Sequence, residues 1–190
     1  MRGDDKGKLM GSFKTLSSKL IYRARIFDLK AVSMKAPDGH QFRHEVIVHP
    51  GAAVIIPILK GGQFVLVKQY RTAVGKSIWE FPAGTLEQNE APLSCAKREI
   101  VEETGFEAKR WRKLVSFFPA PGISTEFMHI FLASDLRPAR MSPDRDEFIE
   151  RHIVSFKRLQ KMILSGIIVD AKTIVGFFYY CEKVKRRKSV

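Results

Sequence analysis

Three glutamates crowd one short stretch of the chain, where they could hold a divalent cation. Glu99, Glu102 and Glu103 lie within five consecutive residues. Residues three and four apart share one face of a helix, so the three carboxylates would repel one another there. They fall near the C-terminal end of the expected helix, where the macrodipole is also negative. A divalent cation would compensate, and an all-oxygen ligand set favours a hard ion such as Mg²⁺ or Mn²⁺ over zinc.

A wider pattern of residues surrounds this cluster. It reads Gly84, five residues, Glu90, seven residues, then Arg98-Glu99-Ile100-Val101-Glu102-Glu103-Thr104-Gly105-Phe106. Residues 80–103 hold six Glu against one Lys and one Arg, a net charge of −4 within a basic protein. A Glu-rich helix alone is more often a solvated face. Seven fixed identities at fixed spacing, however, arise by chance on the order of 10⁻⁸ per start position, so the pattern indicates a metal site.

Two residues of the pattern have expected supporting roles. Arg98 lies four residues before Glu102 and is expected to orient one carboxylate through a bidentate ion pair rather than to contact substrate. Gly105 suits a left-handed cap at the end of the helix. At the other end, Asn89 is expected to cap the helix, with Pro92 tolerated in its first turn.

The apolar periodicity alternates between strand and helix types along the chain. Strands are expected over residues 24–34, 41–48, 52–59, 64–70, 78–81, 114–118, 128–133 and 153–156, and helices over 90–104, 157–164 and 171–185. Turn residues at 37–39 and 60–63 predict two hairpins. Residues 1–20 show no period and are expected to form a loose basic arm. This order of elements predicts an α/β (α+β) fold with a mixed sheet and a boundary near residue 50.

The pattern around the glutamates matches every position of the Nudix box, so the chain resembles the Nudix hydrolases. The resemblance implies metal-dependent hydrolysis of a nucleoside diphosphate linked to another moiety. It also implies an α/β/α sandwich preceded by a small N-terminal antiparallel β-sheet. Residues 1–50 would form that β domain, with its basic arm, and build a homodimer, while residues 51–190 would form the Nudix hydrolase domain. In the family, the glutamates matching Glu99, Glu102 and Glu103 hold the cations, often with the main-chain carbonyl at the position of Ala83.

Motifs outside the box resemble the ADP-ribose pyrophosphatase subfamily. These motifs are Gln69-Tyr70-Arg71, Glu80-Phe81-Pro82-Ala83-Gly84, Pro121-Gly122 and Asp170-Ala171-Lys172-Thr173-Ile174. They imply a homodimeric, Mg²⁺-dependent pyrophosphatase that converts ADP-ribose to AMP and ribose 5-phosphate. A broader nucleoside diphosphate sugar hydrolase shares every one of these motifs and is the closest alternative.

Four residues outside the box are candidate substrate contacts. Arg71 would clamp the diphosphate, and Glu80 would contact the substrate or support the site. Glu126 would contact a metal or a phosphate edge, and Phe27 or a neighbouring aromatic residue would stack on adenine. Three of them have an ordinary alternative: Arg71 as a surface arginine after a strand, Glu80 as an exposed strand residue, and Phe27 as part of the core. Asp170 is at least as well explained as the N-cap of the last helix.

A loop before the last strand is expected to supply the catalytic base. It reads Asp144-Arg145-Asp146-Glu147, and relatives in the subfamily often carry acidic residues at all four positions. Glu147 is the predicted base, with Asp144 and Asp146 as alternatives and Glu102 of the box as another. Arg145 interrupts the acidic run and could instead bind a phosphate.

The formal net charge of +13 raises an alternative of another class, an RNA-binding or RNA-end-processing protein. Residues 1–30 and residues 183–190 each carry +5, which leaves +3 for residues 31–182. Charge concentrated at the chain ends is typical of solvated tails, so nucleic acid is not the expected partner. A non-catalytic Nudix fold would need a damaged box, whereas this box is intact.

The number of cysteines and the hydropathy of the chain indicate the cellular compartment of the protein. Two cysteines, Cys95 and Cys181, are too few for a disulfide scaffold and fit a reducing environment. The longest uncharged apolar run, 173–181, is far shorter than the roughly 20 residues that cross a bilayer. A cytoplasmic protein that does not enter the membrane is therefore expected.

Overall fold

The computed structural model describes residues 11–140 and 148–185. The described chain divides into two compact units between His49 and Pro50. The first unit also contains Ala120–Thr125, a segment that the sequence places inside the second domain.

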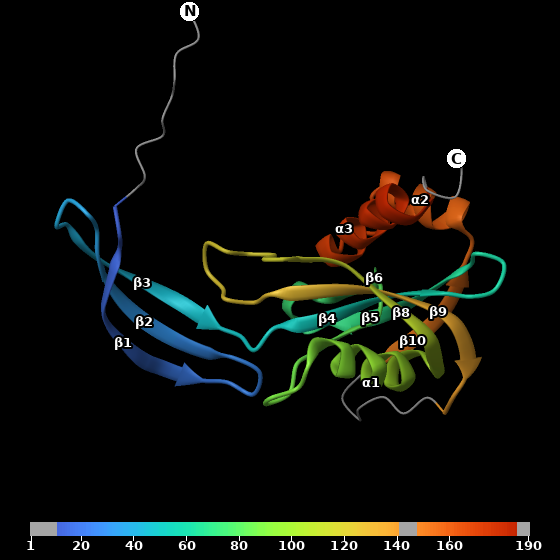
Figure 1. Cartoon of the computed structure of the whole chain (residues 1–190), viewed down its shortest axis with the longest axis horizontal. Helices are drawn as coiled ribbons and strands as arrows, with labels where there is room; N and C mark the ends of the chain where they lie inside the picture. The colour runs from blue at the N-terminus through green and yellow to red at the C-terminus, as the bar shows by residue number, and fades with distance from the viewer. Residues whose placement is uncertain (1–10, 141–147, 186–190) are drawn as a thin grey trace, which may run out of the picture. The chain divides into compact units, whose positions relative to one another are not determined.

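The first unit is a three-stranded antiparallel sheet in the order β1-β2-β3 (Figure 1). Its strands are β1 (Lys14–Arg23), β2 (Asp28–Lys35) and β3 (Gln41–Val48). The predicted hairpin between β2 and β3 is confirmed, and Asp38 closes its turn by accepting the backbone N–H of His40 at 2.9 Å. The segment Ala120–Thr125 binds the far edge of this sheet, because the Ile47 N–H donates to the Ile123 carbonyl at 2.9 Å.

The prediction of a loose arm over residues 1–20 is wrong for its described second half. Residues 14–23 form strand β1, and every residue of that strand is exposed. A strand with neither face buried has no need of alternating apolar and polar residues, so its sequence carries no period of two. Strand β2 also begins later than expected, since residues 24–27 form the preceding turn, with the Ala24 N–H donating to the Phe27 carbonyl at 2.9 Å.

The second unit is built on a mixed seven-stranded sheet, as predicted. Strands β10, β5, β4, β9 and β8 follow one another across it, while β6 pairs with β5 and β7 pairs with β4. Only β4 and β9 are parallel among the pairs of the described sheet. The bounds are β4 (Ala52–Ile58), β5 (Phe64–Arg71), β6 (Lys76–Glu80), β7 (Ala83–Thr85), β8 (Phe106–Phe117), β9 (Met128–Pro138) and β10 (Ile149–Val154).

Strands β4 and β5 separate beyond their connecting turn, and we call this opening in the sheet the fork. The two strands, predicted as a hairpin, pair in register only at Ile58 and Phe64, next to their turn. Farther along, β6 pairs with β5 and β7 pairs with β4, so the chain from Lys76 to Thr85 enters the fork. The Ile55 N–H donates to the Pro82 carbonyl at 2.8 Å and holds the segment between these two short strands.

Helices cover both faces of this sheet, which confirms the expected three-layer fold (Figure 1). Helix α1 (Pro92–Thr104) lies on one face, and α2 (Phe156–Leu164) and α3 (Ala171–Tyr180) lie on the other. Alternate residues of β4 serve the two cores: Ala53 and Ile55 pack with α1, while Val54 and Ile56 pack with α2 and α3. A strand buried on both faces is expected to be continuously apolar, as β4 is.

Several element boundaries differ from the expected ones. Helix α1 begins at Pro92 with Ala91 as its N-cap, so Asn89 is not the cap; it has a positive φ of 61° in the preceding turn. Proline at the first helical position sets φ for the helix and loses no hydrogen bond there. Strands β8 and β9 extend well beyond the expected ranges because they pair with each other along their charged outer parts. Helix α3 ends at Tyr180, and a π-helical turn, Cys181–Lys185, follows it. No helix in the described ranges is long and apolar enough to span a membrane.

Candidate active site

Helix α1 turns an acidic face towards the sheet. Cys95, Ala96 and Ile100 are buried there, and so are Glu99 and Glu103, two carboxylates one turn apart. The helix ends at Gly105 with φ of 64°, and the Gly105 N–H donates to the Val101 carbonyl at 2.9 Å, which confirms the predicted left-handed cap. Because burying an ionised carboxylate costs free energy unless positive charge or donors surround it, this face requires partners.

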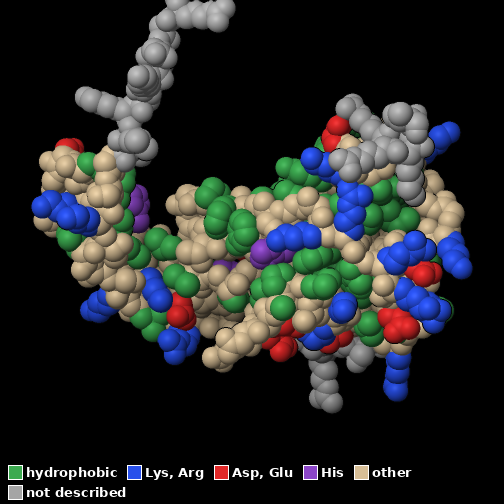
Figure 2. Space-filling view, in the orientation of Figure 1, with side chains coloured by type: hydrophobic (Ala, Val, Ile, Leu, Met, Phe, Trp, Pro, Cys, Tyr) green, Lys and Arg blue, Asp and Glu red, His purple; other side chains and the backbone are tan. Residues whose placement is uncertain are grey.

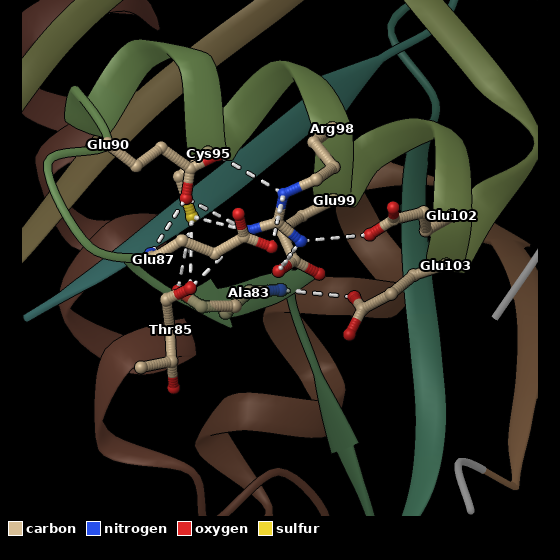
Figure 3. A network of polar contacts seen from close by, with 10 residues as sticks. Ala83, Thr85, Glu87, Glu90, Cys95, Arg98, Glu99, Glu102 and Glu103 are labelled. Carbon is tan, nitrogen blue, oxygen red and sulfur yellow. Dashed lines mark hydrogen bonds and ion pairs between the residues drawn. The ribbon is translucent and has the colours of Figure 1, made fainter. Parts of the chain in front are cut away.

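Arg98 supplies positive charge to the buried Glu99 and to two half-buried carboxylates, those of Glu90 and Glu102 (Figure 3). Its Nε and Nη2 donate to the two oxygens of Glu90 at 3.1 and 3.0 Å, a bidentate pair. Its Nη1 donates to Glu99 Oε1 at 2.6 Å and to Glu102 Oε2 at 3.0 Å. The bidentate partner of Arg98 is therefore Glu90, whereas Glu102, four residues after Arg98, accepts a single hydrogen bond. The hydrogen bonds to Glu90, followed by the charge of Glu99, hold the pKa of Arg98 above its ordinary value against the opposing effect of burial.

The backbone of β7 lies against the two buried glutamates. The Ala83 N–H donates to Glu103 Oε2 at 3.1 Å (Figure 3). A Cβ added to Gly84 would come within 1.7 Å of Glu99 Oε1, so only glycine leaves room for that carboxylate. Strand β7 and helix α1 therefore fix each other through the same groups that the box pattern singles out.

Cys95 has a structural role beside these groups. Its Sγ lies 3.5 Å from the Gly84 carbonyl and 3.6 Å from the Thr85 carbonyl. Burial, aided by the charges of Glu99 and Glu90, raises the pKa of the thiol to about 12. Cys95 is therefore a protonated donor to β7 and not a nucleophile.

Arg71 and Glu80 form a bidentate ion pair at the end of β5. Arg71 Nε donates to Glu80 Oε1 at 2.6 Å, and Arg71 Nη2 donates to Glu80 Oε2 at 2.7 Å. Glu80 is only 1% exposed, so the alternative of an exposed strand residue is wrong for it, whereas the Arg71 side chain is 38% exposed. The Glu80 hydrogen bond raises the pKa of Arg71 in spite of burial, and the charges of Glu80 and Glu103 add to the effect. Arg71 therefore lies within electrostatic reach of the acidic face of α1.

The donor set on α1 fits a hard divalent cation in its chemistry. Glu99, Glu102 and Glu103 offer only oxygen atoms, and two of them are buried. As they stand, no three acidic, histidine or cysteine side chains among the described residues are gathered closely enough to hold a metal ion. Arg98 donates to two of the three glutamates instead. The ligand roles of these residues and of the Ala83 carbonyl stay predictions.

Residues 48–174 match the family model described as the NUDIX domain. This chain belongs to the Nudix family. It is 34% identical over 168 residues to an ADP-ribose pyrophosphatase of Bacillus subtilis (strain 168), an alignment that covers 87% of this chain and 91% of the relative. It is also 34% identical over 175 residues to a methanol dehydrogenase activator of Bacillus methanolicus, an alignment that covers 91% of this chain and 94% of the relative. A GDP-mannose pyrophosphatase of Escherichia coli O1:K1 / APEC is 34% identical over 154 residues, covering 75% and 80%.

The Nudix fold is also found by structural comparison. A crystal structure of an ADP compounds hydrolase superposes with a TM-score of 0.85, covering 96% of this chain and 100% of that one. The two sequences are 22% identical, so this likeness bears on the fold alone.

The remaining predicted site residues of this Nudix protein are Glu126, Phe27 and Glu147. Glu126 is half-buried in the second unit, two residues before β9. Phe27 is half-buried in the turn between β1 and β2 of the first unit, so it is not part of the core that the second unit builds. Their binding roles stay predictions. Glu147 lies outside the described residues, together with Asp144, Arg145 and Asp146.

One motif residue had a predicted structural role that is confirmed. Asp170 is the N-cap of α3, where its Oδ2 accepts the Thr173 N–H at 3.0 Å. Lys172, two positions later in the same motif, had no predicted role, yet it donates to the buried Glu80. A single lysine in the first turn of an otherwise apolar helix was the available signal.

Proposed function

We propose that this chain is a metal-dependent hydrolase of nucleoside diphosphate sugars and that ADP-ribose is its substrate. The observation that carries the proposal is the charge balance around Arg98, where one guanidinium lies within 3.0 Å of three carboxylates, those of Glu90, Glu99 and Glu102. A further cation would relieve this excess of negative charge. The similarity to the ADP-ribose pyrophosphatase of Bacillus subtilis supports the choice of substrate.

The metal site would consist of Glu99, Glu102 and Glu103 with the carbonyl of Ala83, and Mg²⁺ is the proposed ion. The chemistry that a divalent cation supplies when bound is neutralisation of the diphosphate charge and a more acidic water nucleophile. In this proposal Arg98 keeps the glutamates oriented, since its bidentate pair with Glu90 anchors it to the loop before α1.

Arg71 would hold the diphosphate. Its Nε and Nη2 face Glu80, which leaves Nη1 and the outer edge of the guanidinium for a phosphate oxygen. Water would attack one phosphorus in line, the bridging P–O bond would break, and a carboxylate would take the proton of the water. We assign that base to Glu147, with Glu102 as the alternative. The products would be AMP and ribose 5-phosphate.

The N-terminal sheet would build a homodimer. Phe13, Leu16, Leu20, Ile21 and Tyr22 are each between 41% and 61% exposed on or beside β1. Figure 2 shows hydrophobic side chains of this sheet at the surface among Lys and Arg side chains. Exposed apolar side chains gathered on one strand mark an interaction surface, and a second copy of the chain would cover them.

A broader substrate range is the second candidate, favoured by the similarity to a GDP-mannose pyrophosphatase. The deciding experiment compares kcat/KM for ADP-ribose, GDP-mannose and a UDP-sugar in Mg²⁺ and identifies the products. A preference of at least about tenfold for ADP-ribose, a free-energy difference of about 1.4 kcal/mol, supports the narrow function. Comparable rates support the broad one. No Mg²⁺-dependent turnover of any of the three would refute the proposal.

A further inference from the structure

Glu80 lies buried between two cations that come from opposite parts of the chain. Arg71 of β5 binds both of its oxygens at 2.6 and 2.7 Å. Lys172, in the first turn of α3, donates its Nζ to Glu80 Oε2. Glu80 is 1% exposed and Lys172 is 8% exposed, so solvent does not screen this contact.

The start of α3 holds Lys172 in place. Lys172 Nζ also donates to Asp170 Oδ1 at 2.9 Å. The other oxygen of Asp170 accepts the N–H and the hydroxyl of Thr173, at 3.0 and 2.6 Å. One carboxylate therefore caps the helix and at the same time anchors the lysine that faces Glu80.

The same turn of α3 also holds the chain that leads into β7. The Phe81 N–H donates to the Thr173 hydroxyl at 2.7 Å, and both residues are buried. Asp170 and Thr173 thus fasten the backbone next to Glu80, two residues before Ala83. The side chain of Lys172 does not hold this backbone, because within the described residues its ammonium binds only the carboxylates of Glu80 and Asp170.

Lys172 therefore affects the charge that Arg71 faces. If Arg71 were the only cation beside Glu80, the negative charge of this carboxylate would offset the positive charge of Arg71 alone. Because Lys172 takes part of the charge of Glu80, Arg71 keeps more of its own positive charge for a group on its outer edge. The two cations flank one carboxylate in a fixed geometry, so the direction of the guanidinium is fixed as well.

We propose that Lys172 is a positioning residue, which acts through Glu80 to aim Arg71 at the substrate diphosphate. The inference rests on the proposed function, in which Arg71 binds that diphosphate. The alternative is a structural role, in which Lys172 only fastens α3 to the sheet. The Asp170–Thr173–Phe81 contacts already provide such a fastening.

The first test follows the Arg71 guanidinium directly, without substrate. The Nε–Hε cross-peak of Arg71 is recorded by ¹H–¹⁵N NMR in the full chain and assigned with Arg71→Lys. We expect Lys172→Met to shift or broaden this peak, and Lys161→Met, which removes an exposed lysine of α2, to leave it unchanged. A peak that stays in place in folded Lys172→Met would overturn the proposal.

The second test separates binding from turnover. Lys172→Met should raise the KM for ADP-ribose about tenfold, the size expected for one weakened charge-assisted hydrogen bond, and should leave kcat within about twofold. Asp170→Asn keeps the helix cap, because asparagine caps well, and should move KM in the same direction by less. It provides the test if Lys172→Met does not fold. Unchanged KM values in both folded variants would overturn the proposal.

A double-mutant cycle tests whether Lys172 acts through Glu80. In a Glu80→Gln background, Lys172→Met should change KM by less than about twofold, because the carboxylate that links the two cations is gone. Independent, additive effects would overturn the proposal. If the wild-type protein hydrolyses no ADP-ribose, the proposed function fails, while the NMR comparison still decides whether Lys172 positions Arg71.

Discussion

At the scale of single residues, this site is a set of buried and half-buried charges that hold one another. Glu103 is 1% exposed and accepts the Ala83 N–H, and Arg98 reaches three other glutamates. Removing one member of such a set leaves its partner buried without compensation, which costs more than the pair contributes. Single substitutions are therefore informative here, provided that folding is measured together with activity.

Glu103→Gln should abolish most of the turnover without unfolding the protein. Glutamine keeps the size of the side chain and an oxygen for the Ala83 N–H, but it removes the charge that a divalent cation requires. We expect a loss of roughly 10³-fold in kcat, measured with saturating Mg²⁺ and ADP-ribose. Glu107→Gln, at an exposed position on β8, is the matched control and should keep normal activity. Near-normal turnover in Glu103→Gln would contradict the assignment of the metal site.

Glu80 should make the stability of the protein depend on pH. Burial alone would raise its pKa, but the hydrogen bond and charge of Arg71 and the charge of Lys172 outweigh burial and lower it. A lowered pKa in the folded state contributes stability above the unfolded value of about 4.3, and this contribution is lost as pH falls through the folded value. The Tm difference between wild type and Glu80→Gln should therefore be largest near pH 7 and shrink below about pH 4. A difference independent of pH would show that Glu80 is not ionised in the fold.

At the scale of elements, the short strand β7 and helix α1 form one unit. Strand β7 pairs with β4 through Ala83 and Val54, and it occupies the space that the fork between β4 and β5 opens. The carboxylate of Glu99 fills the position that a side chain at Gly84 would need. The approach of the two elements is thus set by the absence of one methyl group.

Gly84→Ala should separate these two elements. The new Cβ would meet Glu99 Oε1 at 1.7 Å and Cδ at 1.9 Å, so the carboxylate must move. We expect a loss of about 1–3 kcal/mol in the free energy of unfolding and a large fall in kcat. Gly122→Ala is the control for stability, because its Cβ would meet nothing within 4 Å and its φ is not positive. An unchanged Tm and unchanged activity in Gly84→Ala would contradict the close approach.

At the scale of the whole molecule, two features favour interactions with other molecules: the exposed apolar side chains of strand β1 and the positive net charge. Strand β1 is exposed along its entire length, although it carries several large apolar side chains. The net charge of +13 is concentrated outside the box region, which carries −4. Such a surplus can attract anionic nucleotides over long range without base contacts, and no RNA-binding role is needed to explain it. The cytoplasmic location and the dimer stay predictions.

Charged substitutions on β1 should produce a monomer. In the proposed homodimer, Leu20 and Ile21 are covered by the second copy, so Leu20→Glu/Ile21→Glu would bury two charges at the interface. Light scattering should give about twice 21.7 kDa for the wild type and about 21.7 kDa for the variant. Leu164→Glu, on the exposed end of α2, is the control and should remain dimeric. A wild-type monomer, or a dimer in the double variant, would contradict this interface.

The sequence by itself determined the chemistry, because the groups that carry it are local. The box spans Gly84 to Phe106, and helical spacing alone places Glu99 and Glu103 on one face. Mixed strands and helices also followed from periodicity, since buried elements repeat apolar residues at a fixed interval. Periodicity did not predict strand β1, because neither face of β1 is buried and its apolar residues do not recur at a fixed interval.

Only the tertiary structure decided how distant charges meet. Glu80 and Lys172 are 92 residues apart, and the apolar residues around Lys172 do not tell which carboxylate its ammonium meets. A local sequence pattern does not predict that a charged side chain is buried. The free-energy cost of its burial is offset by an oppositely charged partner that can lie far away in the sequence. The same holds for Glu90, which is the bidentate partner of Arg98. Local spacing thus specified the candidate groups of the site, and the fork in the sheet and the start of α3 decided how they are held.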